Sequence, residues 1–207
     1  QMKATGEVMA IERNLEAALL KAVRSLEIGL IHLEMPELKA LSDEEVRERI
    51  HLIDDQRLFV IAEAFRRGVT IDEVHDITKI DKWFLQKVMN IVDMENRIKT
   101  EPMTAKLMLA AKKKGFADVT IAGYTGKTWQ EVREMRKGWG IIPTYKMVDT
   151  CAAEFEAETP YFYSTFDKEN EAEEFIREQK SDKKTIIVFG SGPIRIGQGV
   201  EFDYVSV

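Results

Sequence analysis

The residues best suited to chemistry lie near the end of the sequence, where glycines follow a short apolar run. Residues 186–189 form the run, and they precede Gly190, Gly192, Gly197 and Gly199. A strand that leads into a glycine-rich turn is typical of the first strand and helix of a nucleotide-binding unit. However, Arg195 occupies the third glycine position of the dinucleotide fingerprint, and the acidic residue expected about 20 positions further on would fall beyond Val207. By itself this motif is weak evidence for nucleotide binding.

A second glycine motif, GYTGKT at 123–128, contains the Gly-Lys-Thr of phosphate-binding loops. That loop requires another glycine five residues earlier, where this sequence has Ile121, and no strand precedes it. We therefore interpret the stretch as a turn between two helices, with Thr128 as the N-cap of the second.

Each of the remaining candidate residues has a structural interpretation beside the functional one. The sequence has a single cysteine, Cys151, so an internal disulfide and a thiolate zinc cluster are excluded. Cys151 is either a nucleophile or, as we favour, a buried structural thiol. The histidines lack metal-ligand spacing and are predicted to be ordinary surface or interface residues: His32, His51 and His75. Three glutamates alternate along an extended segment and would share one side, either a cation- or phosphate-facing edge or, as we favour, a solvated face: Glu154, Glu156 and Glu158.

Composition places the chain among ordinary soluble proteins of one or two domains. It has 207 residues, of which 44% are hydrophobic and 32% charged. The net charge of -6 disfavours broad binding to nucleic acid or to an anionic membrane, and Lys112–Lys114 are predicted to be a solvated helix end. No apolar run reaches the length of a membrane span, and no signal peptide is visible. The single cysteine fits a reduced, cytoplasmic setting.

The middle of the sequence is predicted to be helical, and its helix starts are well marked. Three capping boxes pair Ser42 with Glu45, Thr70 with Glu73, and Thr128 with Glu131. Two longer helices carry apolar faces. The first face comprises Leu58, Ile61, Ala62 and Phe65, and the second comprises Phe84, Leu85, Val88, Ile91 and Val92.

Residues 66–78 and 113–125 are an internal repeat that aligns without a gap. Each copy begins with two basic residues and a glycine, ends in threonine, and is followed by another helix. We predict two helix–turn–helix units packed against one another. This geometry raises an alternative function, a DNA-binding regulator whose recognition helix presents Arg133 and Arg136 to a groove. The acidic balance of the chain speaks against it.

After Ile142 the helical pattern stops. Residues 151–182 are predicted to be an extended connector, and the charged stretch at 167–184 is either a short exposed helix or a loop. The predicted fold class is mainly α: a bundle of helix–turn–helix units, with a short C-terminal strand that begins a truncated α/β subdomain.

Two longer stretches, TYKMVDTCAAEFEA at 144–157 and GSGPIRIGQGVEFDY at 190–204, are far more specific. Together with MKATGEVMAI at 2–11 and IDKWFLQKV at 80–88, they resemble the large subunit of carbamoyl-phosphate synthase over essentially the whole chain. The sequence departs from that family at Glu12 and Arg13, where a glycine is usual, and at Val205, where cysteine is frequent.

The resemblance implies a large subunit with two ATP-grasp halves joined by a helical oligomerisation domain. One half makes carboxyphosphate from bicarbonate and ATP, ammonia from a glutaminase subunit converts it to carbamate, and the other half phosphorylates the carbamate. The implied cofactors are ATP with Mg²⁺ or Mn²⁺ and K⁺, and the implied pathways are arginine and pyrimidine biosynthesis. The implied partners are the glutaminase small subunit and other large subunits, with no nucleic acid and no membrane.

On this map residues 1–33 end the first half, 34–150 form the oligomerisation domain, 151–182 connect, and 183–207 begin the second half's pre-ATP-grasp subdomain. The resemblance places Glu7, Gly199 and Glu201 along a carbamate tunnel, where glycine keeps the bore open, and it makes Arg195 a loop-positioning charge. The expected role of this chain is scaffolding, with no catalytic residue, metal or cofactor of its own, because ATP-grasp chemistry needs metal-binding carboxylates and an ATP cleft.

Overall fold

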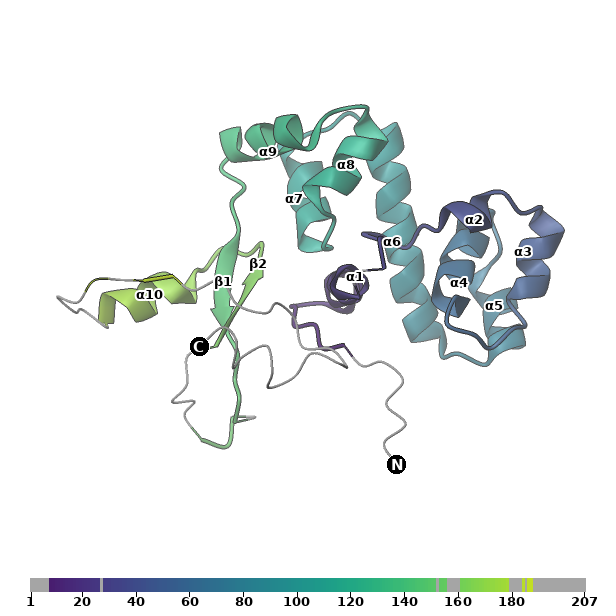
Figure 1. The fold of residues 1–207 in the computed structure, drawn as a ribbon, viewed down its shortest axis with the longest axis horizontal. Coiled ribbons are helices and arrows are strands. Elements are labelled where there is room, and N and C mark those ends of the chain that lie inside the picture. The colour runs from purple at the N-terminus through teal and green to yellow at the C-terminus, as the bar shows by residue number, and fades with distance from the viewer. Residues whose placement is uncertain are drawn as a thin grey trace.

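The computed structural model describes residues 8–26, 28–151, 153–155, 161–178, 184 and 186–187. In these residues the chain is mainly helical, as predicted, with a small antiparallel sheet (Figure 1). The helices are α1 (Leu15–Ser25), α2 (Pro36–Lys39), α3 (Asp43–Arg49), α4 (Arg57–Arg66), α5 (Ile71–Thr78), α6 (Lys82–Thr100), α7 (Ala105–Lys113), α8 (Asp118–Thr125), α9 (Trp129–Gly138) and α10 (Glu171–Glu178). The strands are β1 (Thr144–Met147) and β2 (Phe162–Thr165). Of the strand expected at 186–189, only Ile186 and Ile187 are described, and neither lies in a strand.

Three helices begin with the capping boxes that the sequence predicts. At the starts of α3, α5 and α9, the hydroxyls of Ser42, Thr70 and Thr128 accept a hydrogen bond from the backbone N–H three residues later. The glutamate at that later position accepts one from the backbone N–H of the cap. Each cap stabilises its helix by about 0.5–2 kcal/mol, because these N–H groups have no partner inside the helix. Residues 123–128 therefore contain the last residues of α8, a turn at Gly126 and the N-cap of α9, which agrees with the predicted turn between two helices.

The predicted repeat is confirmed as a repeated helix–turn–helix unit. α4 and α7 are each followed, two residues after their last residue, by a glycine of positive φ, 83° at Gly68 and 85° at Gly115. In both copies the residue after the glycine donates its N–H to the carbonyl five residues earlier, at 3.0 Å and 3.1 Å. This is the Schellman arrangement, which favours glycine because other residues are strained in the left-handed region. α5 and α8 follow, and they too end alike, at the left-handed residues Lys79 and Gly126.

The core lies where α4 and α6 pack against the shorter helices. The predicted face of α6 is buried at Leu85, Val88, Ile91 and Val92. The prediction was wrong for Phe84, which is 52% exposed and stacks its ring edge-on against Trp83, with 5.0 Å between the centroids. α4 is buried around its whole circumference at 59–65, because α2, α3 and α6 all contact it.

The region after Ile142 contains more regular structure than the expected connector. β1 and β2 pair antiparallel, with Thr144 opposite Thr165 and Met147 opposite Phe162. α10 packs against β1 and decides between the two alternatives for the charged stretch in favour of a short helix. Figure 1 shows this hairpin and α10 beside the helical body rather than within it.

Candidate functional site

Two segments far apart in the sequence dock onto one place, the corner between α7 and α8 at residues 112–118 (the α7–α8 corner). One segment is α1, which precedes the corner in the sequence, and the other is the β1–β2 hairpin, which follows it (Figure 1). The structure thereby brings together the parts of the chain that precede and follow the helical body. This junction is the strongest candidate for a functional site in the described residues.

α1 approaches the corner so closely that only a glycine fits. A Cβ on Gly115 would lie 2.7 Å from the Cα of Ala17, which is shorter than real contacts. Nη1 of Arg24 donates to the carbonyl of Gly115 at 2.9 Å, and Nδ2 of Asn14 donates to the carbonyl of Lys113 at 2.9 Å. Side chains at the N-cap and in the last turn of α1 therefore hold the main chain of the corner.

A buried carboxylate reinforces the contact. Glu16, in the first turn of α1, is 3% exposed and accepts hydrogen bonds from Nδ2 of Asn90 at 2.8 Å and Nζ of Lys114 at 3.2 Å. Burial alone would raise the pKa of Glu16, but these bonds outweigh burial and hold the pKa below its ordinary value. The carboxylate therefore stays charged and links α1 to both α6 and the corner.

The hairpin meets the other side of the corner through Phe166, the residue after β2. Its ring lies against Nζ of Lys112, 4.8 Å from the centroid, and against the guanidinium of Arg136 at 5.5 Å. Both cations also bind Asp118, Lys112 at 2.7 Å and Arg136 at 2.9 Å. Burial lowers the pKa of Lys112, and the negative charge of Asp118 opposes this shift. Burial alone would raise the pKa of Asp118, but Lys112 and Arg136 hold that pKa below its ordinary value.

These contacts correct two predictions. Lys112, expected at a solvated helix end, is 7% exposed. Arg136, offered to DNA in the alternative function, is 9% exposed and held by Asp118 and by the carbonyl of Ile141 at 3.0 Å. Its guanidinium is used inside the protein, so α9 lacks one of the two cations that the DNA-binding hypothesis assigned to it.

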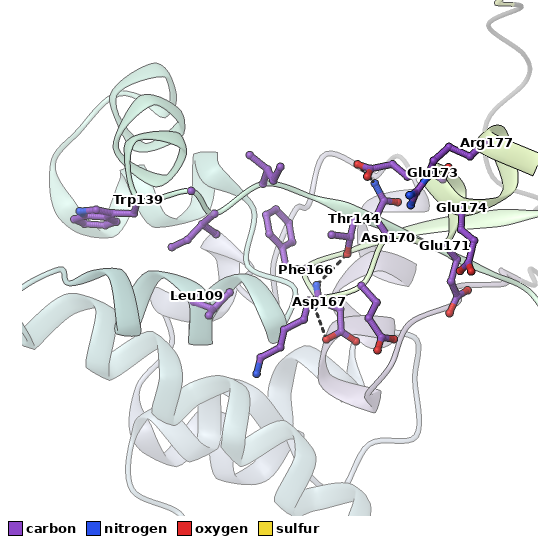
Figure 2. Close-up of a pocket in the computed structure, with 15 residues that line it drawn as sticks. Leu109, Trp139, Thr144, Phe166, Asp167, Asn170, Glu171, Glu173, Glu174 and Arg177 are labelled. Carbon is purple, nitrogen blue, oxygen red and sulfur yellow. Dashed lines mark hydrogen bonds between the residues drawn. The ribbon is translucent and has the colours of Figure 1, made fainter.

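A groove of about 900 Å³ opens where the helical body meets the β2–α10 link (Figure 2). Leu109 and Trp139 form its wall on the body, and carboxylates from 167–174 line the opposite wall. Two of these carboxylates bind the same buried side chain: Nζ of Lys146 donates to Glu169 at 2.9 Å and to Glu171 at 3.0 Å. They hold the hairpin against α10.

A second group of charges lies inside the helical body, centred on Glu95 of α6 (the Glu95 cluster: His32, Glu34, Glu63, Arg66, Glu95 and Lys99). Glu95 has no exposed surface, and its oxygens accept three hydrogen bonds from Arg66 at 3.0 Å to 3.1 Å and another from Lys99. Burial alone would raise the pKa of Glu95, but His32 and Arg66 outweigh burial and hold the pKa far below its ordinary value.

His32 was predicted at the surface or at an interface, and this prediction was wrong. It is 4% exposed, with Nε2 3.4 Å from Oε2 of Glu95 and its ring against Phe116, 4.8 Å between centroids. Burial lowers the pKa of His32, opposed by Glu95. His32 therefore connects the α1–α2 link, to which it belongs, with Glu95 of α6 and with Phe116 of the α7–α8 corner.

Sequence reasoning missed Glu95, although a signal was present. Glu95 continues the buried positions of α6 that Val88, Ile91 and Val92 begin, so a carboxylate stands in an apolar pattern. A charge at a core position indicates a buried partner, because an unpaired charge there is too costly.

The site residues expected from the sequence lie outside the described residues: Glu7, Arg195, Gly199 and Glu201. Cys151 is only half-buried, with its Sγ 3.8 Å from the hydroxyl of Thr150. Glu154 is exposed, and the other two glutamates of its row are not described. Within the described part of the chain, no group of acidic, histidine or cysteine side chains is arranged to hold a metal ion. The helices described here also lack the length and apolar character needed to span a membrane.

Comparison with known proteins agrees with this architecture. Residues 7–140 match the family model of the carbamoyl-phosphate synthetase large chain, oligomerisation domain, and residues 182–207 match the carbamoyl phosphate synthase preATP-grasp domain. A carbamoyl phosphate synthase large chain from Lachnoclostridium phytofermentans is 55% identical over the whole of this chain, which spans 19% of that relative's length. The chain therefore belongs to the carbamoyl-phosphate synthetase large-chain family, and most of it is the oligomerisation domain.

Proposed function

We propose that this chain is the scaffold of a carbamoyl-phosphate synthase, a ligase that makes carbamoyl phosphate from bicarbonate, ATP and glutamine-derived ammonia. The observation that carries the proposal is the order of the two matches, the oligomerisation domain at 7–140 followed by the preATP-grasp domain at 182–207. In the whole protein, ATP with Mg²⁺ or Mn²⁺ and K⁺ would be bound by the flanking halves, and a glutaminase subunit would supply the ammonia. The single cysteine supports a location in the cytoplasm.

The proposed domain limits follow the resemblance: 1–33 ending the first half, 34–150 the oligomerisation domain, 151–182 the connector, and 183–207 beginning the second half. Under these limits α1, which the oligomerisation-domain match at 7–140 also covers, would be the last helix of the first half. Its packing on the α7–α8 corner would then attach that half to the helical body. The hairpin would attach the second half to the same corner through Phe166.

The tunnel role of Glu7, Gly199 and Glu201, with Arg195 positioning the loop, is part of the same proposal. In the full-length enzyme, Gly199→Phe should lower carbamoyl-phosphate formation by about tenfold or more, since even small misplacements along a reaction path carry costs of that order. Bicarbonate-dependent ATP hydrolysis should be retained, because each half keeps its own site. Gly197→Ala, a smaller change two residues earlier in the sequence, is the control. Full carbamoyl-phosphate synthesis by the Gly199→Phe enzyme would remove the tunnel assignment.

Self-association of large chains is the other half of the proposal. The oligomerisation-domain match supports it, and exposed apolar side chains such as Trp83 and Phe84 provide surface for it. Sedimentation velocity of the full-length enzyme over a hundredfold range of concentration is expected to show a mass that rises above the monomer. A monomer at every concentration would argue against an assembly role for the helical body.

A further inference from the structure

One side chain joins the segment before α1 to the hairpin directly. Lys21 lies in the middle of α1, and its Nζ donates to the carbonyl of Ile11 at 2.9 Å and to the carbonyl of Ser164 at 2.9 Å. The same Nζ lies 2.7 Å from Oε1 of Glu12. An ammonium group has three N–H donors, so these three partners use all of them. Ile11 and Glu12 precede α1, whereas Ser164 belongs to β2.

The surroundings of Lys21 make these bonds effective. The Glu12 side chain is 8% exposed and the Lys21 side chain 30%, so water competes only in part for the ammonium. Hydrogen bonds from a charged donor are stronger than neutral ones. Two of the acceptors are backbone carbonyls, so the bonds hold main chain to main chain. A second ion pair of the same kind, Arg13 with Asp167 at 3.7 Å, lies beside them.

The hairpin needs such external bonds to have a fixed position. Its two strands have four residues each, and an isolated two-stranded sheet is marginally stable in water. α10, which packs on β1, buries none of its own residues completely. The hairpin is therefore held by Phe166 at the α7–α8 corner, by Lys21 on α1, and by the more exposed ion pairs of Asp167 with Arg13 and Lys113.

We infer that Lys21 is a positioning residue that couples the two synthetic halves, by fixing the segment before α1 relative to the hairpin. The inference rests on the proposed function, in which these two segments lead to different halves. Lys21 touches no substrate; it acts through the main-chain segments that it joins. Loss of its ammonium should disturb transfer between the halves more than the chemistry within either.

The test uses the full-length enzyme with Lys21→Met, which keeps the length of the side chain and removes its donors. Hydrogen exchange read by mass spectrometry is expected to speed up about tenfold or more in peptides covering 8–14 and 161–167, because bonds to a charged donor are lost. Peptides covering α5 should not change. Carbamoyl phosphate formed per ATP hydrolysed should fall by about tenfold, the order expected for misplaced reacting groups. The bicarbonate-dependent ATPase of the first half should change less than twofold.

Two further variants separate positioning from a general loss of structure. Lys82→Met removes a surface lysine whose partner, Asp72, lies 2.6 Å away at the far end of the helical body, and it should behave as wild type in both assays. Lys21→Arg retains charge and donors and should restore the product yield toward the wild-type value.

Each outcome decides the inference. Unchanged exchange at 8–14 and 161–167 in Lys21→Met would overturn it, as would faster exchange with an undiminished product yield per ATP. A wild-type enzyme that forms no carbamoyl phosphate would refute the proposed function instead, and the exchange result would then still decide whether Lys21 joins the two segments.

Discussion

Replacing Glu95 by glutamine is expected to lower the free energy of unfolding by about 3–5 kcal/mol, the cost of breaking a buried ion pair from one side. The carboxylate of Glu95 is fully buried and accepts the hydrogen bonds of Arg66 and Lys99. Glutamine removes the negative charge and turns one acceptor into an N–H₂ donor, which would face the donors of Arg66. Chemical denaturation of the variant and the wild type measures the difference.

Glu101→Gln, at the C-cap of the same helix, is a matched control. Glu101 also pairs with a basic residue four positions away, Arg97 at 2.7 Å, but both side chains are about half exposed, 45% and 47%. Exposed pairs contribute little because water screens them. The control should leave the unfolding free energy nearly unchanged. If the two variants were equally stable, the buried charge would not be what holds α4, α6 and the α1–α2 link together.

The effect of Glu95→Gln should depend on pH. The pKa of Glu95 lies below its ordinary value in the folded protein, so its charge stabilises the fold at pH values above the ordinary carboxyl pKa of about 4.3. That contribution is lost as the pH falls through the lower folded-state pKa. The difference between the variant and the wild type should be constant from about pH 6 to 8 and shrink below about pH 4. His32, Arg66 and Lys99 contact this carboxylate, and Glu34 and Glu63 pair with the same cations.

The second large effect is expected at Gly115, where alanine should destabilise the protein by two separate costs. The positive φ of 85° costs a residue with a Cβ about 1–2 kcal/mol. The Cβ would also lie 2.7 Å from the Cα of Ala17, and forcing packed groups apart adds about 1–3 kcal/mol. The clash is with backbone, so α1 must move as a whole and its bonds to the corner must weaken.

The internal repeat supplies the control. Gly68 holds the equivalent position of the first unit, with φ of 83°, and a Cβ there would have no atom within 4 Å. Gly68→Ala should show the first cost without the second. Thermal and chemical denaturation compare the variants, and faster hydrogen exchange across α1 in Gly115→Ala alone identifies the displaced helix. Equal destabilisation by both substitutions would show that α1 is not packed tightly against this corner.

The sequence was a good guide to features that depend on neighbours along the chain. The capping boxes at Ser42, Thr70 and Thr128, and the two turn glycines of the repeat, were predictable. Each depends on backbone groups only a few residues away, whose bonding is the same in any protein. The family was also evident from long exact stretches, and the comparisons confirm it.

Features that depend on distant parts of the chain could not be predicted from the same patterns. Lys112 and Arg136 resemble solvated helix-end residues until Asp118 and Phe166 are placed beside them. Phe84 fits the apolar period of α6, yet no neighbour covers it fully and it remains half exposed. In each case the periodicity fixes the direction of a side chain on its own helix, and a partner elsewhere decides whether that direction is buried.

What the sequence by itself determined is therefore the three capped helix starts, the repeat with its turn glycines, and the family. Only the tertiary structure decided that α1 and the hairpin meet at the α7–α8 corner and that Lys21 bonds to both segments. The physical reason is the distance along the chain between the groups that interact. A cap or a Schellman turn is completed within one turn of chain, whereas the bond from Lys21 to Ser164 exists only once the helical body has folded and brought two distant backbones within hydrogen-bonding distance.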